Sequence, residues 1–293
     1  MKYTNKKNIP EAFRRVIIND LYDVKRNDQS IISVSDLISP PIIRQLRIRH
    51  WDNLEEDVSD MSARMKGTAI HSLAENIEDP YWIIEKRINL DVNGITLSGK
   101  ADYYRIDLFQ IGDYKTIEID SFLRNPEGTI GWYSQLNCYA FLWRSLHFKV
   151  ESLEVNAYLG SWKKYKSSVE GYPQTDMIAV NIPLWTFEQQ QEFINERINY
   201  HLRFKDVKDE DLPVCTPEER WRSTTIHKLY KNNNVRSSFK TTKKELIESI
   251  TQEYEQKYPK ATFSWKTVEG EDKKCIRCLV KKYCSYWKNN NEG

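Results

Sequence analysis

Residues 97–116 have the sequence LSGKADYYRIDLFQIGDYKT, and this stretch decides the fold. β-Branched and aromatic side chains are frequent over residues 95–105 and again over residues 109–117, which predicts two β-strands. A short turn near Asp107 joins them. In a hairpin centred on this turn, Asp102 lies opposite Asp113, and the two Cβ atoms are roughly 5 Å apart on one face of the sheet.

Lys115 is expected beside these two carboxylates, because strand alternation puts it on the same face as Asp113. Two carboxylates this close repel each other, and one of them takes up a proton unless a cation lies between them. Mg²⁺ or Mn²⁺ would relieve the repulsion, lower the pKa of a bound water and polarise a phosphoryl oxygen. Lys115 would then orient that water or stabilise developing negative charge. A surface hairpin with ordinary charges is the competing interpretation.

The composition fits a protein with a substantial core, since the chain has 293 residues of which 40% are hydrophobic. With 44 basic and 42 acidic residues, a nucleic-acid surface would have to arise from local segregation of charge. No apolar run approaches the roughly 20 residues of a membrane span, and the polar N-terminus lacks a signal-like apolar stretch. We therefore expect a soluble cytoplasmic protein with no membrane partner and no disulfides.

The periodicity of apolar residues predicts the remaining elements. Helices are expected over residues 10–23, 41–50, 57–77, 129–147, 187–204 and 242–258, strands over residues 82–89, 150–162 and 177–183, and a second hairpin from residues 225–230 and 235–239. This order predicts an α/β or α+β core. The charged loop at residues 205–211 predicts a boundary, with a core over residues 1–205 and a C-terminal segment over residues 206–293.

Three further polar residues lie on the helices before and after the hairpin. A helix histidine such as His71 is more often a surface or core residue than a metal ligand, although its imidazole could complete a carboxylate site. Gln135 and Tyr139 are spaced i,i+4 and share one helix face. Their ordinary role is a polar helix edge, and their functional role would be to contact a phosphate or to position Lys115.

Four short motifs occur in a fixed order, namely Gly67-Thr-Ala-Ile-His71, Gly99-Lys-Ala-Asp102, Gly112-Asp-Tyr-Lys-Thr116 and Gln135-Leu-Asn-Cys-Tyr139. Together they resemble the RecB-like branch of the PD-(D/E)XK nuclease superfamily. That branch includes the RecB and AddB nuclease domains and the iron–sulfur nucleases that accompany CRISPR adaptation. Each motif alone is a weak signal, but four in order make coincidence improbable. The resemblance covers about residues 58–143 and departs mildly at Asp113, where many relatives carry glutamate.

The resemblance implies a PD-(D/E)XK restriction-endonuclease-like core, in which helices flank a central mixed sheet, and hydrolysis of DNA phosphodiester bonds with Mg²⁺ or Mn²⁺. It implies that the metal ligands are His71, Asp102, Asp113 and the backbone carbonyl of Tyr114. The catalytic residues would be Asp102, Asp113, Lys115, Gln135 and Tyr139. Glu85, on the strand before the hairpin, is a further acidic candidate.

Four cysteines form a candidate metal site near the C-terminus. Cys275, Cys278 and Cys284 are close in sequence, and Cys215 precedes them by 60 residues. Four thiolates can hold Zn²⁺ or an iron–sulfur cluster, and spacing alone does not separate the two. The resemblance favours a structural 4Fe–4S cluster, which would staple the C-terminal segment to the core. In relatives the distant cysteine often precedes the nuclease core, but here no cysteine precedes Cys138, so Cys215 takes that place. Cys138 is its rival, although its position on the helix of Gln135 and Tyr139 argues against it, and unrelated thiols are the remaining alternative.

Residues 220–244 contain eight basic side chains, no acidic one and three interleaved aromatic rings. Such a patch can follow a phosphate backbone while its aromatic rings stack on unpaired bases. A solvated basic face is the ordinary alternative. The candidate DNA contacts are Arg220, Arg222, Lys228, Lys231, Arg236 and Lys240.

These residues predict a metal-dependent DNA exonuclease. Residues 33–44 and 212–221 also resemble phage-encoded members of the group, which implies a role in phage DNA recombination, repair or degradation in the host cytoplasm. DNA is the expected partner, and a recombination or single-strand annealing protein and a second copy of the chain are further candidates. The alternative functions are a structure-specific endonuclease and a non-catalytic DNA-binding assembly subunit.

Overall fold

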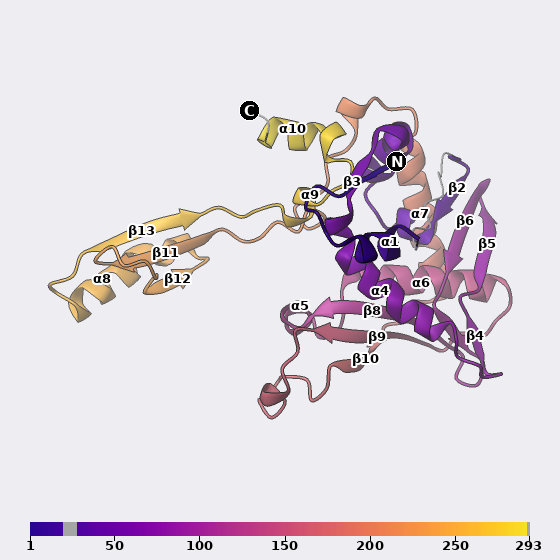
Figure 1. Cartoon of the computed structure of the whole chain (residues 1–293), viewed down its shortest axis with the longest axis horizontal. Coiled ribbons are helices and arrows are strands. Elements are labelled where there is room, and N and C mark those ends of the chain that lie inside the picture. The colour runs from indigo at the N-terminus through magenta and orange to yellow at the C-terminus, as the bar shows by residue number, and fades with distance from the viewer. Residues whose placement is uncertain (20–27, 292–293) are drawn as a thin grey trace. The chain divides into compact units, whose positions relative to one another are not determined.

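The computed structural model describes residues 1–19 and 28–291 and has a mixed α/β architecture (Figure 1). Its contacts divide the chain into two compact units, Met1–Pro213 and Val214–Gly293. The sequence analysis placed the domain boundary at residue 205, and the division between the units lies at residue 213. No helix of the described residues is both long enough and apolar enough to span a membrane.

The first unit contains most of the regular structure. Its helices are α1 (Glu11–Asn19), α2 (Val34–Leu37), α3 (Pro41–His50), α4 (Ser62–Ala74), α5 (Ile119–Arg124), α6 (Ile130–Ser145) and α7 (Phe187–Arg203). Its 3₁₀ turns are η1 (Trp51–Asn53), η2 (Val58–Met61), η3 (Lys164–Lys166) and η4 (Asp209–Asp211). Its strands are β1 (Lys2–Thr4), β2 (Ile31–Ser33), β3 (Glu55–Asp57), β4 (Trp82–Ile84), β5 (Arg87–Val92), β6 (Ile95–Lys100), β7 (Tyr103–Arg105), β8 (Gln110–Glu118), β9 (Ser152–Gly160) and β10 (Met177–Ile182).

The largest sheet of the described residues has the strand order β10-β9-β8-β7-β4. It is mixed, because β8 runs parallel to β9 while the other neighbours are antiparallel. Figure 1 shows β8, β9 and β10 side by side. A second sheet has the order β2-β6-β5, and β1 and β3 form a short parallel pair.

The predicted hairpin is correct in register but its first strand is divided. Tyr103 pairs with Gly112, so extending the ladder by one position brings Asp102 opposite Asp113, as predicted. The prediction of one continuous strand over residues 95–105 was wrong, because β6 pairs with β5 and β2 while β7 pairs with β8. Asp102 therefore lies at the junction where the chain passes from one sheet to the other.

Several other predicted boundaries also differ from the structure. The predicted strand over residues 82–89 is interrupted at Glu85 and Lys86, which separate β4 from β5. The predicted helix over residues 57–77 consists of η2 followed by α4, which ends at Ala74. The predicted helix over residues 10–23 is observed as α1, and its last residues lie outside the described part of the chain.

Helix α6 is the centre of the core. It begins where the sequence predicts because the Thr129 hydroxyl accepts a hydrogen bond from the Trp132 amide, an N-cap that satisfies a free backbone donor. It packs against β5, β6, β8 and β9 and against α7. Gly99 permits this packing, since a Cβ at that position would lie 2.3 Å from Leu142 Cδ1. Small residues on β6 therefore set how closely α6 approaches the sheet.

The described part of the second unit contains a sheet of order β12-β11-β13, in which every pair is antiparallel. Its elements are β11 (Ile226–Lys231), β12 (Phe239–Thr241), η5 (Lys244–Leu246), α8 (Ile247–Lys257), β13 (Phe263–Val268), α9 (Lys273–Ile276), η6 (Lys281–Tyr283) and α10 (Ser285–Asn291). The second strand of the predicted hairpin starts at residue 239 instead of 235, and β13 was not predicted. The sequence pattern did not indicate β13, because its pairing partner β11 lies 32 to 42 residues earlier in the chain.

His201 on α7 makes the stability of the first unit dependent on pH. Its side chain is fully buried, Nε2 donates to the Leu37 carbonyl at 3.1 Å, and Nδ1 has no hydrogen-bond partner among the described residues. Burial lowers the pKa of His201 to about 4, with Arg197 and Arg44 acting in the same direction. The folded state favours the neutral imidazole, so protonation of His201 costs unfolding free energy. The stability is fully present above about pH 6.5 and is lost as the pH falls toward 4.

The unfolding free energy of the wild type should fall between about pH 7 and about pH 5. In His201→Gln we expect this fall to be smaller by about 2 kcal/mol, as measured by urea denaturation at the two pH values. His147→Gln is the matched control, because that histidine is exposed. An unchanged pH dependence in the His201 variant would contradict this assignment.

Candidate active site

Three potential metal ligands meet where α4 approaches the junction of the two sheets. Among the described residues, one ligand atom each from His71, Glu85 and Asp102 lie within 4.8 Å of one another. His71 Nδ1 is 3.2 Å from Asp102 Oδ1 and 3.5 Å from Glu85 Oε1. The hydrogen bond from His71 to Asp102 raises the pKa of the imidazole, against the opposing effect of its burial. One helix and two strand ends therefore assemble a site from segments separated in sequence.

The backbone around Glu85 holds this residue against Asp102. Glu85 has a φ of 53°, in the left-handed region that non-glycine residues rarely occupy. Its amide donates to the Asp102 carbonyl at 2.9 Å, and its Oε2 forms an ion pair with the Lys100 ammonium. Strained backbone of this kind is often found at functional sites. The sequence named Glu85 as a further acidic candidate on the strand before the hairpin, and the structure places it just after β4, beside His71 and Asp102.

Asp102 and Asp113 are held in different ways. Asp102 Oδ2 accepts a hydrogen bond of 2.6 Å from the Tyr114 amide. The Asp113 side chain is 3% exposed and forms an ion pair with the Lys115 ammonium, which alternation along β8 places on the same face. Burial raises the pKa of Asp113 to about 6, the Lys115 charge opposes this, and the Asp102 charge adds to it. Asp113 is thus beside the three-residue group, with its carboxylate turned toward Lys115.

Gln135 and Tyr139 on α6 are hydrogen-bonded to each other. Gln135 Nε2 donates to Tyr139 Oη at 3.0 Å, which leaves the phenolic proton available to a further acceptor. Tyr139 is 5% exposed and belongs to the core instead of the polar helix edge. Burial raises the pKa of Tyr139, and the negative charge of Asp113 adds to the effect. Tyr139 therefore stays a neutral donor close to the Asp113 carboxylate.

The glycines of the motifs differ in their physical roles. A Cβ at Gly112 would lie 1.8 Å from the Tyr103 ring, so only glycine fits between β7 and β8 at this point. A Cβ at Gly67 would meet nothing within 4 Å. Packing therefore requires the glycine beside Asp113 but not the one that precedes His71.

The four C-terminal cysteines all belong to the second unit and are partly buried. Burial raises the pKa of Cys215 to about 12, and Cys278, Cys284 and Cys275 add to the shift through their charges. Among the described residues, however, no three of these thiol sulfurs lie within 4.8 Å of one another, so the structure does not bring the four cysteines together as a closed metal site. Cys138, by contrast, is 1% exposed within α6 of the first unit.

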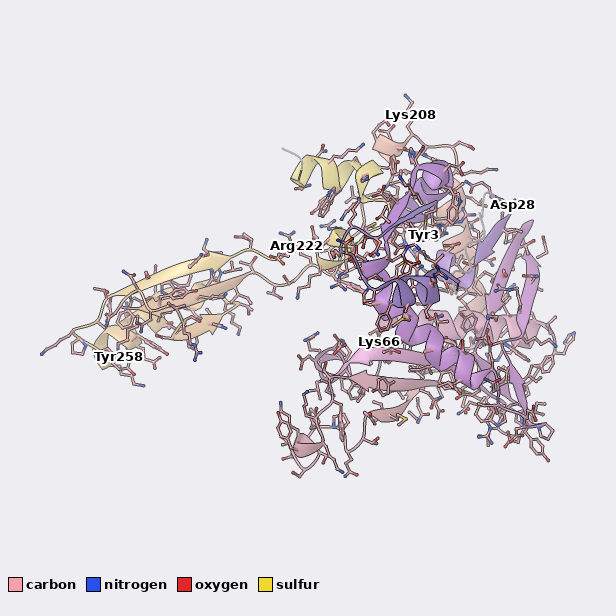
Figure 2. All side chains as sticks on the ribbon, viewed as in Figure 1. Tyr3, Asp28, Lys66, Lys208, Arg222 and Tyr258 are labelled. Atoms are coloured by element: carbon pink, nitrogen blue, oxygen red, sulfur yellow. The ribbon has the colours of Figure 1, made fainter. Side chains whose placement is uncertain are left out.

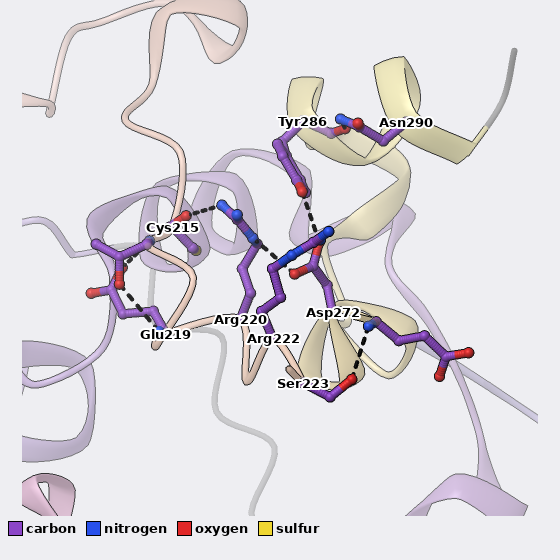
Figure 3. A network of polar contacts seen from close by, with 10 residues as sticks. Cys215, Glu219, Arg220, Arg222, Ser223, Asp272, Tyr286 and Asn290 are labelled. Atoms are coloured by element: carbon purple, nitrogen blue, oxygen red, sulfur yellow. Dashed lines mark hydrogen bonds and ion pairs between the residues drawn. The ribbon is translucent and has the colours of Figure 1, made fainter. Parts of the chain in front are cut away.

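A polar network centred on Asp272 joins the chain segments that carry these cysteines (Figure 3). Asp272 accepts hydrogen bonds from Arg220 Nε at 3.2 Å, Arg222 Nη1 at 3.3 Å and Tyr286 Oη at 2.7 Å. Arg220 also donates to the Cys215 carbonyl, and its guanidinium lies 4.2 Å from the centre of the Tyr286 ring. The network thereby ties the residues near Cys215 to those around Cys275 and Cys284. Nothing in the sequence pattern indicated Asp272.

The predicted DNA contacts occupy different environments. The Arg220 side chain is 11% exposed and engaged with Asp272, whereas the Arg222 side chain is 40% exposed. Lys228 and Lys240 face each other across β11 and β12, and Lys231 Nζ lies 3.3 Å from the centre of the Tyr258 ring. Arg236 is exposed between the two strands. Arg220 is therefore less accessible to a ligand than Arg222.

Two solved structures are similar to part of this chain. No family model matches the chain, and no curated protein matches it. The crystal structure of a protein named SSO0001 is similar, with 16% sequence identity and a TM-score of 0.43 over 68% of this chain and 88% of that one. A phage-related exonuclease from Haemophilus somnus 129PT has 14% identity and a TM-score of 0.30 over 67% of this chain and 80% of its own. At these TM-scores, the geometry of the site has to carry the functional argument.

Proposed function

We propose that the chain is a metal-dependent DNA exonuclease with a PD-(D/E)XK core. The observation that supports this most is the convergence of His71, Glu85 and Asp102 beside the Asp113–Lys115 pair. A group of acidic side chains, an imidazole and an ammonium in one place is suited to hydrolysis of a phosphodiester. We further propose that it acts in phage DNA recombination, repair or degradation.

The donor set fits Mg²⁺ or Mn²⁺. Carboxylate oxygens suit both ions, and the imidazole of His71 is a ligand that Mn²⁺ accepts. The close approach of the acidic groups also fits a cation, because burial and the Asp102 charge both disfavour ionised Asp113 in its absence. Such an ion would lower the pKa of a water and polarise a phosphoryl oxygen. His71, Glu85 and Asp102 would hold it, with Asp113 and the Tyr114 carbonyl as the other proposed ligands.

The neighbouring side chains would act on the substrate. The Lys115 ammonium, held beside the site by Asp113, would orient the attacking water or stabilise negative charge on the phosphate. Tyr139 keeps its proton and would donate a hydrogen bond to a phosphate oxygen or to Asp113, while Gln135 fixes the orientation of the phenol. Gln135 and Tyr139 would thereby present a hydrogen-bond donor that needs no rearrangement when substrate binds.

In the second unit, we propose that Cys215, Cys275, Cys278 and Cys284 hold a structural 4Fe–4S cluster, with Zn²⁺ as the alternative. The support is that the Asp272 network joins the chain segments that carry Cys215, Cys275 and Cys284. Metal binding would then contribute directly to the folding of this unit.

Digestion of end-labelled DNA tests the proposed activity. Linear and closed circular DNA, single- and double-stranded, would be incubated with Mg²⁺, Mn²⁺ or EDTA. We expect loss of linear DNA alone, only with metal, and the label would give the polarity. Cutting of circles would favour a structure-specific endonuclease. Retained binding with no cleavage of any substrate would favour a non-catalytic assembly subunit.

A further inference from the structure

A row of three lysines crosses the sheet of the second unit. Lys228 on the central strand β11 pairs with Lys240 on β12 and with Lys266 on β13. Residues paired in this way project from the same face of a sheet. Lys266 lies outside the basic stretch identified in the sequence, and only the pairing of β13 brings it into the row.

This arrangement is unfavourable for the isolated protein. Like charges directly opposite one another on neighbouring strands destabilise a sheet. The three strands contain four lysines and no acidic residue. Within the described part of the chain, no carboxylate forms an ion pair with any of these three ammonium groups. The repulsion is therefore not relieved from within the unit.

The opposite face of the same sheet is covered by α8. Trp265 Nε1 donates to Thr251 Oγ1 at 2.8 Å, the Phe239 and Tyr254 rings are 6.2 Å apart, and Leu229 is fully buried. Figure 2 marks Tyr258, the residue that follows α8. The alternation of the strands thus leaves Lys228, Lys240 and Lys266 on the face that α8 does not cover.

Helix α8 and the uncovered face of the sheet carry opposite charges. Helix α8 carries Glu248, Glu253 and Glu255 and a single lysine, Lys257. A polyanion would therefore be repelled from the helix and attracted to the uncovered face of the sheet. That face also carries Tyr230, which lies two positions from Lys228 on β11.

We propose that the uncovered face of the β12-β11-β13 sheet, with Lys228, Lys240 and Lys266 at its centre, binds the phosphate backbone of DNA. This inference rests on the proposed function for its choice of DNA as the polyanion. With strands roughly 4.8 Å apart, the row spans about 10 Å, and duplex DNA carries one charge per about 1.7 Å of its axis, so three ammonium groups can engage several phosphates. Tyr230 would stack on an unpaired base where one is exposed.

A salt titration tests the surface independently of cleavage. Binding of the full chain to a labelled DNA duplex with a single-stranded end would be measured by fluorescence anisotropy in EDTA at several salt concentrations. We expect the triple variant Lys228→Gln, Lys240→Gln, Lys266→Gln to bind about 10- to 100-fold more weakly. The slope of log K against log salt should also decrease by about 2 to 3.

Two matched variants control for net charge and for folding. Lys244→Gln, Lys257→Gln, Lys260→Gln removes the same charge from η5, α8 and the following turn, and should retain most of the slope. Replacing the three row lysines by arginine should restore binding. Equal losses in the row and control variants would overturn the proposal, as would binding of the wild type to anionic phospholipid vesicles but not to DNA. A wild type that binds DNA through the row but cleaves none would overturn the nuclease proposal alone.

Discussion

Asp102→Asn should lower metal-dependent cleavage of linear DNA by at least about 10³-fold, because it removes a charge on which the proposed ion and the His71 imidazole both depend. The amide oxygen of asparagine can still accept the hydrogen bond from the Tyr114 amide, so the fold should survive. The measurement is the initial rate of label release at saturating Mg²⁺ or Mn²⁺. The thermal unfolding midpoint of the same preparation would show that the variant is folded.

The control for this variant is Asp107→Asn in the turn between β7 and β8. Asp107 forms an ion pair with Arg105 away from the proposed ligands, so its loss should leave the cleavage rate nearly unchanged. We also expect Asp113→Ala and Lys115→Ala to abolish cleavage, since each removes one member of the Asp113–Lys115 ion pair. Metal-dependent cleavage at the wild-type rate by purified Asp102→Asn would refute the proposed site.

The second large effect is expected in the C-terminal unit, where Cys278→Ala should remove any brown colour and lower its thermal stability. If four thiolates hold a cluster, replacing one of them weakens cluster binding. Cluster binding contributes to the free energy of folding of this unit, so the variant should also be less stable. The unfolding midpoint should fall by on the order of 10 °C. Iron and sulfide content, visible absorbance and thermal unfolding would be measured on protein prepared without oxygen and with iron supplied.

Cys138→Ala provides the comparison, because Cys138 is buried in α6 of the first unit. This variant should keep the visible absorbance and the iron content of the wild type. If the wild type is colourless and contains zinc, the four cysteines bind Zn²⁺ instead of an iron–sulfur cluster. If it is colourless and contains no metal, the four cysteines are ordinary thiols. Loss of colour in the Cys138 variant instead would make Cys138 the fourth ligand.

The sequence alone determined the features that depend on local periodicity and capping. Helix α6 begins after Thr129 because a threonine hydroxyl can cap it, and the inward and outward residues of β9 alternate as predicted. The register of Asp102 and Asp113 also follows from the turn between their strands, because a short turn fixes which residues face each other. The proximity of Asp113 and Lys115 follows instead from side-chain alternation, because the two residues are two positions apart on β8.

Only the tertiary structure decided which distant segments meet. It divided the predicted strand at Asp102 between two sheets, set Glu85 beside His71, and turned Arg220 inward to Asp272. It also paired β13 with β11, which placed Lys266 in the row of lysines. Periodicity reports which face of an element is apolar but not which partner covers it, because partner choice depends on packing between residues far apart in the chain. The places of Asp272 and Lys266 in their side-chain groups could therefore not be predicted from the sequence pattern.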